Sequence, residues 1–186
     1  FLVSAPAEGT YTRPPMVVRV NIGSQNFYVA SIHTSPGVAT QEIQDLPKVA
    51  NARYNTDNEI MIVGDFNADG SYFTESTGWP VFNAAFSPTS SAHTNAIGDS
   101  VDTTVAQGNT YTYDRMTLSP NLAAKMLANS AAPYYFDGYA QDASVACPGG
   151  EVALMAAIIA QGYGTTCNTA AAQVSDHYPV SVQLIY

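Results

Sequence analysis

A short apolar run, Glu59 to Asp65 (E-I-M-I-V-G-D), constrains the fold more than any other segment of the chain. Apolar residues occupy consecutive positions here instead of alternate ones, which is typical of a strand buried on both faces of a sheet. The run ends in a polar loop that contains Asp65 and Asn67. The sequence therefore predicts an interior strand with a carboxylate and an amide directly after it.

Alternation and turn residues predict further strands around this one. Met16–Ile22 and Asn26–Thr34 flank the turn residues 23–25 and are expected to form a hairpin. Residues 1–15 are expected to form a loop or an extended lead-in, and residues 78–98 to be irregular. Strands or extended pieces are predicted at 101–104, 111–118, 133–136 and 179–185.

Two segments carry the apolar spacing of helices, Val38–Tyr54 and Glu151–Gln161. Pro47 inside the first predicts a kink or a late start. Strands and helices mix without strict β-α-β alternation. This favours an α+β sandwich of sheets with helices outside over a doubly wound parallel sheet. The length of 186 residues fits one domain, with residues 16–186 as its body.

Charged residues make up only 11% of the chain, and its formal net charge is −9. Because phosphate binding normally needs a basic surface, this argues against a protein that holds nucleic acid by bulk charge. A metal-dependent enzyme that contacts phosphate at one site remains possible. The longest apolar run, Val152–Ala160, is too short to cross a bilayer, so no membrane span is expected.

The two cysteines, Cys147 and Cys167, lie on either side of the predicted helix over 151–161. A disulfide between them would close a loop, which stabilises a fold by about 3 kcal/mol. Such a bond implies an oxidising compartment. The alternative is two unrelated buried thiols, since the sequence has no Cys/His cluster for zinc.

Polar side chains that could act in catalysis or metal binding lie at or near the ends of predicted strands: His33, Asp65, Asn67, Asp114 and His177. Each has an ordinary explanation on its own, because strand-end histidines form structural hydrogen bonds and D-x-N is common in turns. Together they supply oxygen ligands for a hard cation such as Mg²⁺, two imidazoles, and a carboxylate to orient one of them. These are the parts needed to hydrolyse a phosphate ester.

Five strings then occur in an order that matches a known superfamily: I-H at 32–33, I-V-G-D-F-N-A-D at 62–69, D-S-V-D-T-T at 99–104, Y-D-R at 113–115 and S-D-H-Y-P-V at 175–180. The chain resembles the endonuclease/exonuclease/phosphatase superfamily, and within it the secreted deoxyribonuclease I branch. G-D-F-N and S-D-H-Y-P-V indicate the superfamily, whereas D-S-x-D-T-T and the early histidine indicate that branch.

The resemblance implies a four-layer αββα sandwich with its site at the rim. It also implies a secreted, extracellular enzyme that cleaves DNA. His177 would be a catalytic imidazole oriented by Asp114, and His33 would be the second imidazole. Which histidine is the acid and which the base is left open by the sequence.

The same resemblance implies two metal sites. Asp65, Asn67 and Asp176 would hold Mg²⁺, with Asp65 and Asn67 also positioning the phosphate. Asp102 and Thr104 are similar to the start of a structural Ca²⁺ loop. The rest of that loop departs from the family pattern, because the segment up to Asp114 is one residue longer.

Two departures from the family are visible in the sequence. Gly70 and Tyr111 occupy the positions of a family disulfide, so that bridge is absent. The match also begins midway through the family domain, so residues 16–186 resemble its C-terminal portion. Activity is therefore expected to need a second chain or fragment that carries the N-terminal half, with its metal-binding Glu and its DNA-gripping Arg and Tyr residues.

Two other functions fit the sequence. One is an inactive extracellular structural or assembly protein on the same fold, which the low charge and the 12 tyrosines suggest. The other is a phosphodiesterase that acts on lipid head groups. Arg13 and Arg115 are expected either to meet phosphate or to form ion pairs and hydrogen bonds. His93 and Trp79 are expected to be structural.

Overall fold

The computed structural model describes residues 2–4, 11–53, 59–86, 92–106, 108–138 and 151–186. Its centre is a six-stranded sheet with the strand order β1-β2-β3-β4-β6-β5. The strands are β1 (Leu2–Ser4), β2 (Met16–Ile22), β3 (Gln25–His33), β4 (Ile60–Asp65), β5 (Thr94–Asn95) and β6 (Asp114–Leu118). The predicted interior strand is confirmed, because β4 lies between β3 and β6 and its first three residues are buried.

The predicted hairpin is also confirmed, since β2 and β3 pair antiparallel with Ile22 opposite Gln25. Gly23 turns the chain between them at a φ of 60°, a left-handed conformation that glycine adopts without steric cost. In contrast, β3 and β4 run parallel. A helical crossover connects them, so the carboxyl ends of both strands lie at the same edge of the sheet.

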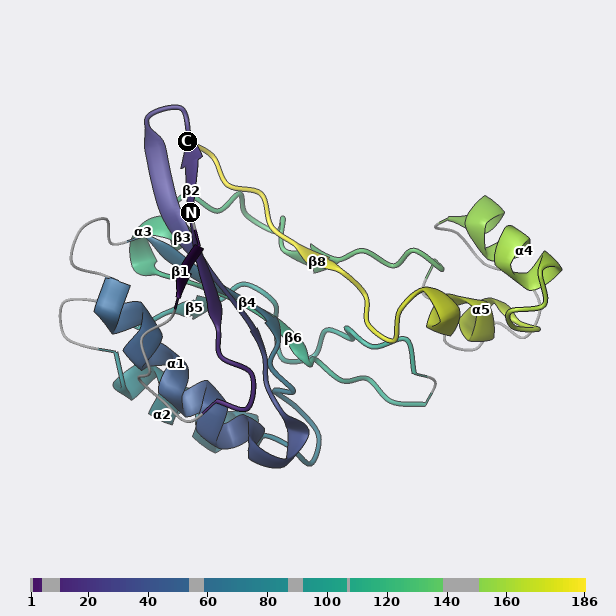
Figure 1. The fold of residues 1–186 in the computed structure, drawn as a ribbon, viewed down its shortest axis with the longest axis horizontal. Coiled ribbons are helices and arrows are strands. Elements are labelled where there is room, and N and C mark those ends of the chain that lie inside the picture. The colour runs from purple at the N-terminus through teal and green to yellow at the C-terminus, as the bar shows by residue number, and fades with distance from the viewer. Residues whose placement is uncertain (1, 5–10, 54–58, 87–91, 107, 139–150) are drawn as a thin grey trace.

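One face of the sheet is covered by helices α1 (Ala39–Arg53) and α2 (Glu75–Ala84), as Figure 1 shows. The 3₁₀ turn η1 (Pro36–Val38) leads into α1, which confirms the first predicted helix. The predicted late start is wrong, because α1 begins well before Pro47. A fully buried stripe stabilises the helix across the proline: Ile43, Leu46, Val49 and Ala50.

The segment 78–98 is not irregular throughout, because α2 extends into it as far as Ala84. Gly78 and Pro80 are poor helix residues, and they misled the sequence prediction. The helix forms because Trp79 and Phe82 pack into the core between the sheet and α1. Tertiary burial thus outweighs local preference at this position.

The opposite face of the sheet is covered in part by the segments 119–138 and 180–186. These contain α3 (Pro120–Ala123) and the two-stranded sheet of β7 (Ala132–Pro133) and β8 (Val180–Ser181). The strands predicted at 133–136 and 179–185 are therefore shorter than expected, and the one predicted at 111–118 begins only at Asp114. The one predicted at 101–104 is reduced to a bridge between Thr104 and His177.

Helices α4 (Val152–Ala160) and α5 (Cys167–Val174) form a lobe that projects from the sheet (Figure 1). The lobe confirms the helix predicted over 151–161, and it has its own apolar cluster around Phe136, Met155 and Tyr178. Cys167 is fully buried there, whereas Cys147 lies outside the described residues, so their disulfide stays a prediction. Across the described ranges, every helix is too short or too polar to span a membrane.

The architecture confirms the α+β class, while the four-layer arrangement stays a prediction for the whole fold. Of the two forms expected for the lead-in, the extended one is observed at Leu2–Ser4, which pair with β2 as an antiparallel strand. The backbone of β2 presents unpaired groups on its outer edge, and β1 satisfies them.

Candidate active site

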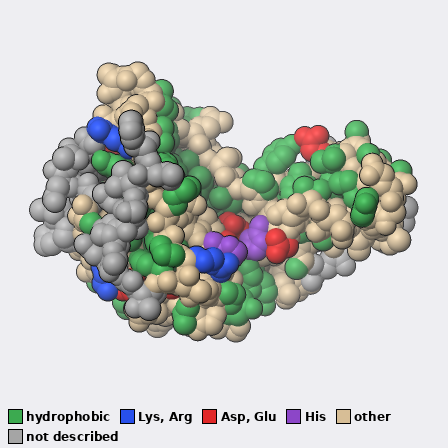
Figure 2. All heavy atoms as spheres, in the orientation of Figure 1, with side chains coloured by type: hydrophobic (Ala, Val, Ile, Leu, Met, Phe, Trp, Pro, Cys, Tyr) green, Lys and Arg blue, Asp and Glu red, His purple; other side chains and the backbone are tan. Residues whose placement is uncertain are grey.

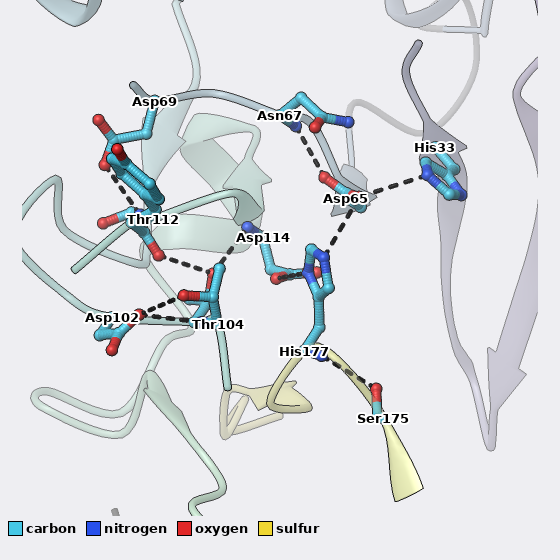
Figure 3. A network of polar contacts seen from close by, with 12 residues as sticks. His33, Asp65, Asn67, Asp69, Asp102, Thr104, Thr112, Asp114, Ser175 and His177 are labelled. Atoms are coloured by element: carbon cyan, nitrogen blue, oxygen red, sulfur yellow. Dashed lines mark hydrogen bonds and ion pairs between the residues drawn. The ribbon is translucent and has the colours of Figure 1, made fainter. Parts of the chain in front are cut away.

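Three candidate residues are register partners in neighbouring strands. His33 at the end of β3 lies opposite Asp65 at the end of β4, and Asp65 lies opposite Asp114 at the start of β6. Residues in register point to the same face of a sheet. Figure 3 shows them together, with His33 Nε2 3.3 Å from Asp65 Oδ2.

This row lies on the sheet face away from α1 and α2. Along β4, Ile60 and Ile62 belong to the core under the helices, whereas Met61 and Val63 pack on the opposite side. Because side chains alternate along a strand, Asp65 shares the face of Met61 and Val63. The site therefore forms where that face reaches the edge of the sheet.

His177 joins the row from the C-terminal segment, 63 residues away from Asp114 in the chain. Two backbone hydrogen bonds and one bridge fix residues 176–178 against residues 103–105. His177 Nδ1 then lies 2.7 Å from Asp114 Oδ2, and its Nε2 lies 3.8 Å from Asp65 Oδ2. Both imidazoles thus face one carboxylate, that of Asp65.

The two sides of this network shift in pKa for different reasons. The hydrogen bond that His177 Nδ1–H donates to Asp114 raises the pKa of His177 to about 9, against an opposing effect of burial. Burial raises the pKa of Asp65, and the backbone N–H of Asn67 and the positive charges of the histidines only partly oppose it. His177 is therefore protonated at neutral pH, and its positive charge favours the ionised form of the neighbouring Asp65 carboxyl group.

The loop after β4 is shaped to present its polar groups. Gly64 has a φ of 133°, and a Cβ built on it would lie 2.0 Å from the Ile32 carbonyl oxygen, so only glycine fits. Asn67 adopts a φ of 48°, and its N–H donates to Asp65 Oδ1 over 2.8 Å. The side-chain amide of Asn67 donates to the Thr34 carbonyl oxygen over 3.0 Å, which leaves its own oxygen for a ligand.

Arg13 borders the site, because its guanidinium also donates to the Thr34 carbonyl oxygen, over 2.8 Å. Arg13 is exposed, so the expectation that it meets phosphate is sterically possible. Figure 2 shows histidine side chains (purple) at the surface between the sheet and the α4–α5 lobe, with acidic (red) and basic (blue) groups beside them. The site is thus open to a large ligand.

The donors for Mg²⁺ form only part of a metal site. Asp65 and Asn67 provide oxygens on one loop, which suits a hard cation. Asp176, the third predicted ligand, is exposed, and its charge contributes to the raised pKa of His177. Within the described ranges, no group of three or more His, Cys, Asp or Glu could hold a metal ion. A complete metal site therefore needs further ligands.

Asp102 and Thr104, predicted to begin a Ca²⁺ loop, lie on the side of Asp114 away from Asp65 and His33 in Figure 3. Asp102 is buried, and its Oδ1 accepts hydrogen bonds from the N–H and the hydroxyl of Thr104, both over 3.0 Å. These contacts shape the turn by themselves. A role in binding Ca²⁺ stays a prediction.

Arg115 is fully buried under α2 and has no access to a phosphate. Its guanidinium pairs with Glu75 and, over 2.6 Å, with Asp99, and it donates to two backbone carbonyl oxygens. Of the two expectations for this residue, the ion pair is the one observed. Arg115 lies on the helix side of β6 because strand alternation turns it away from Asp114.

The residues expected to be structural are buried as predicted. His93 stacks on Phe86, with ring centroids 4.3 Å apart, and its Nδ1 lies 3.1 Å from Thr117 Oγ1. Burial lowers the pKa of His93 to about 3, so it stays neutral. Trp79 is 7% exposed and packs between Phe73 and Phe82.

Three tyrosines at the site, Tyr72, Tyr111 and Tyr113, were not predicted from the sequence. Tyr113 lies next to His177, with ring centroids 6.1 Å apart, and contacts both Tyr72 and Tyr111. The available signal was position, because Tyr113 directly precedes Asp114 and Tyr72 closely follows the Asp65 loop. Burial, together with the nearby tyrosine and carboxylate groups, raises the pKa of Tyr113 to about 12.

Comparison with known proteins gives consistent sequence and structural matches. The chain is 31% identical to deoxyribonuclease-1 of Bos taurus over 182 residues and 33% identical to that of Sus scrofa over 181 residues. It is 29% identical to deoxyribonuclease-1-like 1 of Bos taurus over 180 residues. These alignments cover 94% of this chain but 54%, 54% and 48% of the relatives, so the chain spans about half of their length.

Among solved structures, a mannosyl-6-phosphatase of Bacteroides thetaiotaomicron matches with a TM-score of 0.51 at 12% identity. The match covers 95% of this chain and 59% of that one. No family model matches the chain. The structural likeness supports the expected α+β fold, and the matches to deoxyribonuclease-1 agree with the branch that the sequence motifs indicate.

Proposed function

We propose that this chain, which belongs to the endonuclease/exonuclease/phosphatase superfamily, hydrolyses phosphodiester bonds in DNA. The observation that carries the proposal is the convergence of His33 and His177 on Asp65. The two imidazoles come from opposite ends of the chain, and a phosphate placed over Asp65 would meet both. Hydrolysis needs one group to accept a proton from water and another to donate one to the leaving oxygen.

We assign the proton donor to His177. Its Nδ1 is held by Asp114, so Nε2 is the atom that faces the substrate. The raised pKa of about 9 keeps a proton on Nε2 at neutral pH. His33, whose side chain is 56% exposed, is then the group that accepts a proton from the attacking water.

We extend the proposal to a divalent metal ion at the same site. Asp65 and Asn67 would contribute ligands to Mg²⁺, which would neutralise charge on the phosphate when bound. We propose that the other ligands come from a segment equivalent to the part of the relatives that this chain does not span. Activity would then need that segment, supplied as a second chain or fragment.

We place this activity outside the cell, as the deoxyribonuclease I resemblance implies. A disulfide between Cys147 and Cys167 would accord with an oxidising compartment. A structural Ca²⁺ at Asp102 and Thr104 belongs to the same proposal.

Nicking of supercoiled plasmid in Mg²⁺ and Ca²⁺ tests the function. The chain is assayed alone and together with a fragment that supplies the N-terminal part of bovine deoxyribonuclease-1. His177→Ala should lower the rate by about 10²- to 10⁴-fold, which is the usual contribution of a general acid. His93→Phe is the matched control. His93 lies in the core, so this substitution should leave nicking unchanged.

Three results would count against the proposal. Absence of nicking in both preparations would favour the inactive structural alternative. Nicking that His177→Ala does not affect would remove His177 from the reaction. Hydrolysis of sphingomyelin or a phosphoinositide, with no action on plasmid, would favour the lipid head-group alternative.

A further inference from the structure

Three tyrosines from two segments form a continuous aromatic surface next to His177. We call Tyr72, Tyr111 and Tyr113 the tyrosine cluster. The rings of Tyr111 and Tyr113 stack at 5.1 Å with an interplanar angle of 13°, and Tyr72 packs on Tyr113 at 5.8 Å. Tyr113 lies 6.1 Å from the His177 ring, so the cluster extends outward from the candidate proton donor.

The place of Tyr111 in this cluster depends on Gly70. A Cβ built on Gly70 would lie 3.2 Å from Tyr111 Cε1 and 3.4 Å from Tyr113 Oη, so glycine lets the Tyr111 ring pack closely on this backbone. Gly70 and Tyr111 are also the two positions at which the family resemblance places a disulfide, so an aromatic ring stands in this chain where the family pattern has a cysteine.

The rings are accessible to a ligand. Tyr72 is 37% exposed, and Tyr111 and Tyr113 are partly exposed. Thr112, which lies between Tyr111 and Tyr113 in sequence, donates its N–H to Asp69 over 2.9 Å, in the same loop as Asn67 (Figure 3). The cluster is therefore anchored to the loop that carries Asp65.

Charge argues for stacking over phosphate contact on this side of the site. The chain has six Lys and Arg residues against 15 Asp and Glu. Arg115 is fully buried, and the side chains of Lys48 and Lys125 are paired with carboxylates. The Arg13 guanidinium borders the site but is bonded to the Thr34 carbonyl oxygen and not to the tyrosine cluster. An uncharged aromatic surface can hold a nucleotide by its base without needing a cation, because every base has a π-face.

We propose that the tyrosine cluster is a stacking site for an unpaired nucleobase beside the scissile phosphate, and that it gives this chain a preference for single-stranded or locally unpaired DNA. The inference rests on the proposed action on DNA. A base inside a duplex is covered by its neighbours and offers no free face to Tyr111 or Tyr72. An unstacked base has a free face and can stack on the tyrosine cluster while its phosphate lies near His177.

Equilibrium binding of a short fluorescein-labelled oligothymidylate to the full chain, in Ca²⁺ without Mg²⁺, tests the site. The comparison strands are an abasic strand and a duplex of the same length. Tyr111→Ala should weaken oligothymidylate binding by about fivefold or more, which is the usual effect of losing one stacked base. Binding of the abasic strand should not change, and Tyr111→Phe should retain the affinity of the parent chain.

Control variants separate stacking from a loss of structure. Tyr163→Ala changes a tyrosine that is 59% exposed on the α4–α5 lobe and should have no effect. If Tyr111→Ala does not fold, Tyr72→Ala tests the same site from its outer ring. The difference between oligothymidylate and abasic strand should persist as NaCl is raised, because salt weakens phosphate contacts and not stacking.

Several outcomes would overturn the proposal: no measurable binding of oligothymidylate, equal affinity for the abasic strand, equal losses on both strands in Tyr111→Ala, or tighter binding of the duplex. Failure of the proposed function gives a different result. In that case plasmid is not nicked, yet the Tyr111-dependent affinity for oligothymidylate remains.

Discussion

The two faces of the six-stranded sheet each carry a histidine, and they give the two imidazoles opposite properties. Under α1 and α2, His93 is enclosed by Phe82 and Phe86, and burial lowers its pKa to about 3. At the edge of the open face, Asp114 raises the pKa of His177 to about 9. The covering of the face, and not the residue type, therefore decides which histidine is inert and which can exchange a proton.

The same contrast holds for the charged residues of β6. Asp114 points to the open face and orients His177, whereas its neighbour Arg115 points to the helix face and ties Glu75 and Asp99 together. One position along the strand therefore separates a candidate catalytic residue, Asp114, from a structural one, Arg115. Four experiments test this contrast, beginning with the one of largest expected effect.

Gly64→Ala should disrupt the sheet itself. The new Cβ would lie 2.0 Å from the backbone oxygen of Ile32, and backbone cannot move aside as a flexible side chain can. The strained φ of 133° adds to the cost, and we expect a loss of more than about 3 kcal/mol in the free energy of unfolding. Urea denaturation followed by circular dichroism measures it. Gly37→Ala is the control, since open space surrounds that position, and an equal loss there would contradict the explanation.

His93 should make the helix face sensitive to acid. Its folded pKa of about 3 lies below the unfolded value of 6.5, so its contribution to stability is complete above pH 6.5 and is lost as the pH falls toward 3. The slope is about 1.4 kcal/mol per pH unit over that window. Denaturation at several pH values should show this extra slope of the unfolding free energy in the parent chain. His93→Phe, which has an aromatic ring that does not titrate, should not show it. Identical slopes would mean that burial does not set the pKa of His93.

Arg115→Met should destabilise the same face without a direct effect on the site. The substitution leaves Glu75 and Asp99 without their cation, although both carboxylates are partly exposed and regain water. We therefore expect a loss of about 2–3 kcal/mol in stability, below the range for a pair buried on both sides. The variant should still bind oligothymidylate at a temperature where it is folded. A selective loss of DNA affinity would instead support the phosphate contact that burial argues against.

Asp114→Asn should lower the pKa of His177 and leave the fold intact. Without the carboxylate, the pKa should fall from about 9 toward 6.5, which NMR titration of the ring signals measures in the metal-free chain. The folded pKa of His177 is raised, so the stability that this pair contributes is present below pH 6.5 and is lost as the pH rises through 9. An unchanged titration midpoint would show that another group sets the pKa.

The sequence by itself determined the local parts of this protein. Alternation and turn residues located the hairpin, the apolar run located β4, and motif strings located His33, Asp65, Asp114 and His177. These features depend on neighbours within a few residues, so a linear pattern contains them. The likeness to deoxyribonuclease I was also a property of the sequence alone.

Only the tertiary structure decided how the parts meet. Strand pairing brings Asp65 opposite Asp114, and the contact of residues 103–105 with 176–178 brings His177 to both. Burial of Trp79 and Phe82 made α2 a helix despite its glycine and proline. The packing of α2 against one face of β6 decided that Arg115 is buried and that Asp114 is not. Each outcome depends on contacts between segments far apart in the chain, and no local pattern specifies those.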